Sequence, residues 1–345
     1  MVTIKASHEY CEELQHRLCT DLESGLKQKK EWLNAMGLLQ VCNTVICNAR
    51  FDTSSPSYLN LLTHGRGASK IEFSNNAQLF SDITTPKKAS NKRLPAQIYL
   101  DENITLRPEL GVFSGNLDIM ELRGNGIFPM EDSEDLTISQ LREAKGSFTS
   151  LISKFKFPSR LLLIADNYLF KENIEHVKRN VQQWITGLVE QPNSLEHLLF
   201  MLEKKDINVK FKENEFDSFL DEIRSSLEAL NISVKVGIVV GKRKGKGNEN
   251  SRHDRHIFTS YGQFVCTDSL NLFKWEGVSH LPRPNITDTF TLSYRPYTKQ
   301  DKLPAFSKHL ELIQNAIEDP YAQYGVVSSP VLKALFQQFI ITKTS

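Results

Sequence analysis

The densest group of side chains suited to chemistry lies between positions 241 and 256 of this chain. His253, Asp254, Arg255 and His256 follow one another directly, after a stretch rich in glycine and lysine. Arginine offers a planar fork of donors to two oxygens of one phosphate, and lysines and glycine-freed amides add charge and further donors. The segment therefore indicates phosphate recognition. Its other cations are Lys242, Arg243, Lys244, Lys246 and Arg252.

The same segment carries a group suited to catalysis. A histidine among cations can act as a nucleophile or as a proton carrier when a second group lies within hydrogen-bond reach. A basic surface hairpin, in which His253 and Asp254 cap a strand, accounts for the same residues, and composition leaves both interpretations open. The glycines and lysines lack the Gly-Lys-Ser/Thr step of a P-loop, so a nucleotide site of that kind is not expected.

Alternating strands and helices are expected to position this segment. Residues 161–165, 198–202 and 232–240 are short apolar runs, as in strands that are covered on both faces. Apolar residues recur every three or four positions over 174–188 and 216–230, which predicts two amphipathic helices. This alternation predicts parallel strands in an α/β fold. The basic segment follows the third strand, at the carboxyl end where such sheets usually bind ligands.

These features together resemble a known domain. The stretch from Arg252 to Gly262, with its His-Asp-Arg (HDR) motif, is similar to the phospholipase D-like domain at the C-terminus of some MIT-domain proteins. The chain also shares that family's Asp-x-Tyr step after the first strand, here Asp166-Asn167-Tyr168. The resemblance covers about residues 159–297. It implies a phospholipase D-like mixed sheet flanked by helices.

The resemblance also assigns roles to single residues. Catalytic members of the wider superfamily carry His-x-Lys, an aspartate after four further residues, and then Gly-Ser-x-Asn. His253 takes the place of the histidine, Arg255 replaces the lysine, and Ser260 stands where the aspartate belongs. The Ser-x-Asn step is present as Ser269 and Asn271, one residue late. The resemblance thus makes His253 and Arg255 the catalytic candidates, with Ser269, Asn271 and the basic segment binding the ligand.

The departures from the pattern favour binding over turnover. Without the aspartate, the histidine lacks a negative partner that would orient it and set its pKa. Two further His-x-basic matches, at 64–66 and 176–178, also lack the aspartate, so an active site would need a homodimer. We therefore expect a phosphodiester- or polyanion-binding protein with a degenerate, non-catalytic domain. The alternatives are a homodimeric phospholipase D-family nuclease or phosphodiesterase with His253 as nucleophile, and a structural subunit of a larger assembly.

Composition sets the expected ligands and location. The net charge is only +1, so affinity for nucleic acid or another phosphodiester must come from a local patch. Acidic phospholipid head groups, which the MIT-linked relatives bind, are a second expectation. Neither a metal nor a cofactor is expected. The charged N-terminus, the five scattered cysteines and the lack of a long apolar run suggest a cytoplasmic chain without a transmembrane segment. Such a chain would suit a bacterial antiviral defence system.

The length of 345 residues predicts two domains. We expect residues 1–157 to be first helical and then strand-rich, in an α+β arrangement, because leucines spaced four apart give way to short β-prone runs. Residues 158–300 are expected to form the phospholipase D-like domain, with the boundary near Pro158. Residues 301–345 are expected to be helical. The four spaced leucines are Leu14, Leu18, Leu22 and Leu26.

Overall fold

The computed structural model describes residues 3–23, 39, 44–48, 70–73, 79–84, 98–118, 134–143, 148–169, 173–203, 215–241, 255–267, 269–276, 279–282, 291–296 and 323–325. The chain forms two compact units. Unit 1 comprises residues 1–132, 296–304 and 337–345, and unit 2 comprises residues 133–295 and 305–336. Unit 2 therefore begins at Ser133, ahead of the boundary that the sequence suggested near Pro158.

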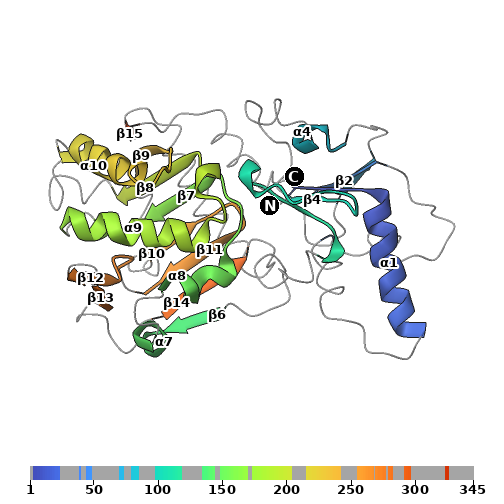
Figure 1. Ribbon diagram of the computed structural model, residues 1–345, viewed down its shortest axis with the longest axis horizontal. Coiled ribbons are helices and arrows are strands. Elements are labelled where there is room, and N and C mark those ends of the chain that lie inside the picture. The colour runs from blue at the N-terminus through green and yellow to red at the C-terminus, as the bar shows by residue number, and fades with distance from the viewer. Residues whose placement is uncertain are drawn as a thin grey trace, which may run out of the picture. The chain divides into compact units, whose positions relative to one another are not determined.

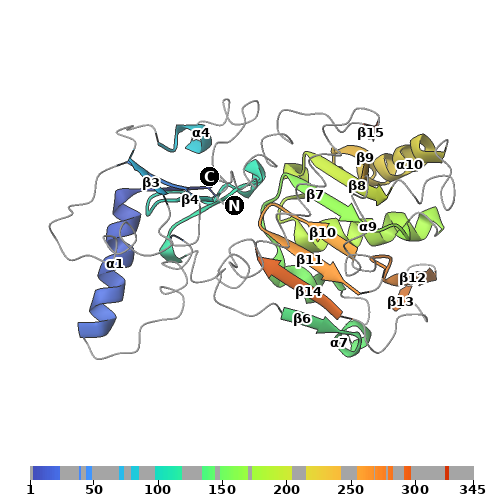
Figure 2. The same ribbon diagram turned by 180° about the vertical axis from the view of Figure 1, so that it is seen from behind.

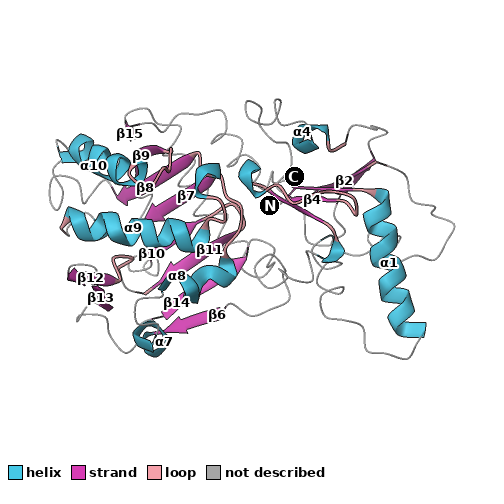
Figure 3. Ribbon diagram, viewed as in Figure 1, coloured by secondary structure: helices cyan, strands magenta, loops and turns pink. Residues whose placement is uncertain are grey.

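Unit 1 contains a five-stranded sheet in the order β3-β2-β1-β4-β5, and every pair of neighbours is parallel. Its strands β2 and β4 are labelled in Figure 3, where strands are magenta. This corrects the α+β expectation for the N-terminal part, which is α/β. The sequence did not indicate a parallel sheet here because the central strand, Thr3–Ala6, is only four residues long and lies ahead of the first helix. The elements are β1 (Thr3–Ala6), α1 (His8–Glu23), β2 (Thr44–Cys47), β3 (Lys70–Phe73), α4 (Ser81–Thr84), β4 (Ile98–Leu100), η1 (Pro108–Leu110) and β5 (Phe113–Gly115).

The first helix packs against its neighbours through the expected leucine face. Leu14 and Leu18 are at most 1% exposed, as are Tyr10 and Cys11 one turn earlier. Ser7 caps the helix, because its Oγ accepts a hydrogen bond from the Tyr10 amide at 3.1 Å. Leu22 and Leu26 lie outside the residues whose side chains are described.

Unit 2 contains an eight-stranded mixed sheet in the order β15-β9-β8-β7-β10-β11-β14-β6, which confirms an α/β fold in general (Figure 1). Strands β7, β8 and β9 are parallel, whereas β10 is antiparallel to β7. The strands of this sheet are β6 (Glu134–Thr137), β7 (Leu161–Ala165), β8 (His197–Glu203), β9 (Lys235–Gly241), β10 (Arg255–Phe258), β11 (Gly262–Cys266), β14 (Thr291–Pro296) and β15 (Gln323–Gly325). Strands β12 (Phe273–Glu276) and β13 (Ser279–Pro282) form a separate hairpin.

Two of the helices in unit 2 match the predicted amphipathic segments. α9 (Ile174–Leu188) and α10 (Phe216–Glu228) lie side by side on one face of the sheet, as opposite views show (Figures 1 and 2). Their buried apolar residues join those of β7, β8 and β9 in one core. The shorter helices are α7 (Ile138–Glu143), α8 (Phe148–Ile152), η3 (Ser153–Phe155) and η5 (Pro192–Ser194).

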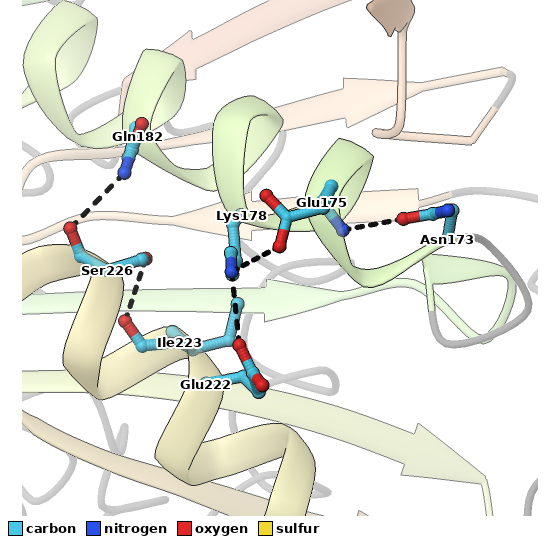
Figure 4. A network of polar contacts seen from close by, with 7 residues as sticks. All are labelled: Asn173, Glu175, Lys178, Gln182, Glu222, Ile223 and Ser226. Carbon is cyan, nitrogen blue, oxygen red and sulfur yellow. Dashed lines mark hydrogen bonds and ion pairs between the residues drawn. The ribbon is translucent and has the colours of Figure 1, made fainter.

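A polar network joins α9 to α10 on their exposed side (Figure 4). The Nζ atom of Lys178 lies 2.5 Å from Glu175 on its own helix and 3.0 Å from Glu222 on α10. Gln182 donates to the backbone oxygen of Ser226 at 3.3 Å. Lys178 thus serves helix pairing, in agreement with the interpretation of residues 176–178 as part of an amphipathic helix.

The C-terminal segment is described only at residues 323–325. They form β15, which pairs with β9, so these three residues are a strand where a helix was expected. Gly325 has a φ of 70° and lies close to the backbone of Val236. A glycine suits this position because larger residues rarely adopt such a φ.

Candidate functional site

The carboxyl ends of β7, β8 and β9 form the edge of the sheet at which the basic segment was expected. Because β10 is antiparallel to β7, with His256 opposite Ala165, Arg255 begins β10 at this same edge. Gly241, the last residue of β9, is the other described neighbour of the segment. The predicted ligand-binding residues between them lie outside the described residues, as does His253. These are Lys242, Arg243, Lys244, Lys246 and Arg252.

Asp166 is the polar centre of the described part of this edge. It directly follows β7, is 2% exposed, and accepts three hydrogen bonds. The donors are the Tyr168 amide at 2.8 Å, the Ser269 hydroxyl at 2.7 Å and the Leu270 amide at 2.7 Å. The carboxylate thereby fastens the turn after β11 to the end of β7. Sequence reasoning noted Asp166 only as part of the Asp-x-Tyr step and did not assign it this role.

The environment of Asp166 acts on its pKa in two directions. Burial raises the pKa of this carboxyl above its ordinary value, because it removes water from the charged form. The three hydrogen bonds and the positive charge of Arg255 act in the opposite direction without cancelling the effect of burial. The Asp166 carboxylate is therefore poised to take up a proton more readily than an exposed aspartate.

Contacts with Tyr168 and Thr267 help to hold Arg255 in place. Its guanidinium carbon lies 4.8 Å from the centroid of the Tyr168 ring, and its Nη1 donates to the backbone oxygen of Thr267 at 2.7 Å. Tyr168 is 36% exposed, so this stacked pair lies at the surface. The planar guanidinium suits both an aromatic face and a carbonyl, and a lysine would not reproduce this geometry.

Ser269 and Asn271 lie in the turn that Asp166 holds. The Ser269 hydroxyl donates to Asp166 and accepts a hydrogen bond from the backbone amide of Asn271 at 3.3 Å. The turn is also attached to α9, since the Trp184 indole donates to the Leu270 oxygen at 3.0 Å. The structure thus places Arg255, Ser269 and Asn271 at the same edge of the sheet.

The side chain of Asn271 is buried, and its amide group is left without hydrogen bonds to the described residues. The residue is 1% exposed, and neither its Oδ1 nor its Nδ2 has a hydrogen-bond partner among the described residues. Buried polar groups in folded proteins nearly always have a partner, and exceptions often mark sites that bind water, an ion or a ligand. No feature of the sequence could have signalled this, because it depends on the surroundings of the folded turn.

Ser260 lies at the opposite edge of the sheet. Its Oγ is 3.0 Å from the Oγ of Ser159 and accepts the Arg160 amide at 3.3 Å, just before β7 begins. The four residues of β10 alone span roughly 10 Å. A side chain at this position contacts the start of β7. The effect that an aspartate at position 260 would have on His253 stays a prediction, because His253 lies outside the described residues.

The second imidazole of the motif has a structural position. His256 is 6% exposed, and its Nδ1 lies 2.7 Å from the Nε2 of Gln263 on β11. Successive residues of a strand point to opposite faces of the sheet, so His256 and Arg255 face different sides. His256 therefore belongs to the packing of β10 and β11.

Comparisons with known proteins add no relative: no protein-family model, curated protein or solved structure matches this chain. Among the described residues, no three or more histidine, cysteine, aspartate and glutamate side chains cluster in a way that could hold a metal ion. In the same residues, no helix is long and apolar enough to cross a membrane.

Proposed function

We propose that unit 2 is a phosphodiester-binding module of the phospholipase D-like type that does not hydrolyse its ligand. The observation that carries this proposal is the buried side-chain amide of Asn271, which has no hydrogen-bond partner in the described part of the chain. Asn271 is close in the chain to Ser269 and Leu270, which Asp166 holds. Its Nδ2 offers donors to a phosphoryl oxygen. Single-stranded nucleic acid is the ligand we infer, and acidic phospholipid head groups share the same phosphodiester chemistry.

In this proposal each residue has a distinct task. The guanidinium of Arg255, oriented by Tyr168 and Thr267, neutralises the phosphate. Asn271 donates to one oxygen. Asp166 and Ser269 position the turn that carries Asn271 and do not contact the ligand. The cations between Gly241 and His253 supply affinity that does not depend on sequence and weakens with salt.

The same geometry argues against turnover. Hydrolysis needs an acid that can release a proton to the leaving group, and Arg255 remains protonated at any ordinary pH. The Asp166 carboxylate already accepts three hydrogen bonds and holds the turn, so it is poorly suited to orient a nucleophile. Binding is therefore the function that these residues support best.

The proposal is tested by titrating the full-length protein into a fluorescently labelled single-stranded oligodeoxynucleotide and into vesicles with and without phosphatidylserine. Arg255→Gln and Asn271→Leu should each weaken binding by about tenfold or more, as expected for the loss of a hydrogen bond to a charged group. Arg224→Gln, which removes an exposed arginine of α10, is the matched control and should bind as the wild type does.

Three outcomes would contradict the proposal. Wild-type affinity in both variants would exclude the site, and an equal loss in the control would reduce it to a general charge effect. Cleavage of the oligonucleotide that disappears in His253→Ala, with binding retained, would favour the homodimeric nuclease. Preference for phosphatidylserine vesicles over the oligonucleotide would instead identify lipid as the source of the phosphodiester.

A further inference from the structure

Tyr168 presents an aromatic ring to solvent at the edge of the sheet that carries Arg255. The residue lies in the turn after β7 and is 36% exposed. Within the described part of the chain, the other large apolar residue that is exposed is Leu230, which follows α10. Single exposed apolar side chains are common on protein surfaces, so exposure alone implies no function. The surroundings of the Tyr168 ring distinguish it from Leu230.

The turn that carries Tyr168 is fixed by its backbone and by the next residue. The backbone amide of Tyr168 donates to Asp166 Oδ1 at 2.8 Å, and the amide of Leu169 donates to the Asp166 backbone oxygen at 3.3 Å. The Leu169 side chain is 1% exposed and belongs to the core of unit 2. Because a tyrosine has few rotatable bonds and this one projects from a fixed backbone, its ring loses little conformational freedom when a ligand packs against it.

A cation lies directly beside this ring. The guanidinium carbon of Arg255 is 4.8 Å from the ring centroid of Tyr168, and Nη1 of Arg255 donates to the Thr267 backbone oxygen at 2.7 Å. A phosphate that binds Arg255 is therefore close to the aromatic ring as well. In a nucleic acid each phosphate is joined to a base through one sugar, so a phosphate at Arg255 brings the attached base within reach of the exposed part of the ring.

The charge of Arg255 favours a neutral, flat ligand group at this ring over a cationic one. Aromatic faces attract cations such as the quaternary ammonium of a choline head group. Here the guanidinium already supplies a positive charge 4.8 Å from the ring centroid, and it repels a second cation. A nucleobase is uncharged at neutral pH and offers a π-face that can stack on tyrosine. Stacking leaves the pairing edge of the base unused, so it suits any base that is unpaired.

We propose that Tyr168 is a stacking platform for an unpaired base of a single-stranded nucleic acid whose phosphate Arg255 binds. This inference rests on the proposed phosphodiester site and extends it from the phosphate to the base. Asp166 positions both parts of the site, because it holds the Tyr168 amide as well as the turn that carries Asn271. The ring thereby distinguishes a nucleic acid from a phospholipid, which has a phosphodiester but no base.

The test compares two ligands that differ only in their bases. The full-length protein is titrated into a labelled oligothymidylate and into a labelled abasic strand of the same length, which keeps every phosphate and sugar. The ratio of the abasic dissociation constant to that of the oligothymidylate then measures what the bases contribute. We expect a wild-type ratio of about five or more. Tyr168→Leu should bring the ratio close to one, whereas Tyr168→Phe, which keeps the ring, and the control Leu230→Ala should retain it.

The outcomes separate the stacking platform from the phosphodiester site. If neither strand binds the wild type, both proposals fail. If both strands bind it equally well, stacking is overturned and the phosphodiester site stands, with recognition of phosphate alone. Stacking is also overturned if Tyr168→Leu retains the wild-type ratio, or if Tyr168→Phe loses it, since the hydroxyl would then be responsible. A displaced Arg255 in Tyr168→Leu weakens the binding of both strands and leaves their ratio unchanged, so it does not imitate the loss of stacking.

Discussion

The hydroxyl of Ser269 donates to Oδ2 of Asp166 at 2.7 Å and so joins the turn after β11 to the end of β7 across 103 positions of sequence. With the Leu270 amide, which donates to the same oxygen at 2.7 Å, it fixes the turn that carries Asn271. The candidate phosphodiester site therefore depends on a carboxylate that does not itself bind the ligand.

Replacing Asp166 should destabilise unit 2 strongly. Asp166→Ala removes the acceptor of three hydrogen bonds and leaves buried donors unsatisfied, so we expect a loss of about 2 to 4 kcal/mol in the free energy of unfolding. Urea denaturation measures this. Asp221→Ala, at an exposed aspartate of α10, is the control and should change the value by less than about 0.5 kcal/mol. A similar effect of both substitutions would show that Asp166 does not hold the turn.

The stability of the protein should rise with pH through the histidine range. The pKa of His197, at the start of β8, is lowered to about 4, first by burial and then by the charges of Lys235 and Arg160. The unfolded chain therefore binds a proton between about pH 6.5 and 4 that the folded chain does not, and stability falls by up to about 3 kcal/mol as the pH drops through this window. Urea denaturation between pH 4 and 7 should show a flatter dependence for His197→Gln. An equal slope in that variant would assign the effect to other groups.

Gly262 should not tolerate a larger side chain. A Cβ at this position would collide with the ring of Tyr294, which is itself buried. We expect Gly262→Ala to lower the free energy of unfolding by about 1 to 3 kcal/mol, as other overpacking substitutions do. In a double-mutant cycle, Tyr294→Ala should relieve part of this loss. Strict additivity of the two effects would rule out the collision as the cause.

The basic segment should contribute affinity through charge alone. Alanine at Lys242, Arg243, Lys244 and Lys246 together should weaken oligonucleotide binding and flatten its dependence on salt. If all four contact phosphates, the slope of log affinity against log salt falls by about 3 for a single strand. Binding at four salt concentrations measures the slope. An unchanged slope would remove the segment from the proposed site.

Much of the sheet in unit 2 could be predicted from local patterns. The unbroken apolar run at 161–165 is β7, and the three-and-four spacing from 174 to 188 is α9, because burial on one or both faces is encoded in consecutive residues. β1 could not be recognised in the same way. Its residues, Thr3–Ala6, form a strand through parallel pairing with β2 and β4, whose residues lie about 40 and 95 positions away.

The resemblance grouped Arg255, Ser269 and Asn271 in one site, and the structure places all three at one edge of the sheet. Their role in binding a ligand stays a prediction. The resemblance did not give the hydrogen bond between Ser269 and Asp166, which joins residues far apart in sequence. Nor could it show that the side-chain amide of Asn271 lacks a partner among the residues that the structure describes, since this property depends on every neighbour in the folded turn.

The most direct test of the phosphodiester site follows the side-chain amide of Asn271 by nuclear magnetic resonance. Its signals are assigned by their absence in Asn271→Leu, and the wild-type protein is titrated with the dinucleotide thymidylyl-thymidine, which carries a single phosphodiester. We predict a saturable shift of these signals with the same dissociation constant that calorimetric titration of the dinucleotide reports. Signals that stay in place while the ligand binds would contradict the proposed site.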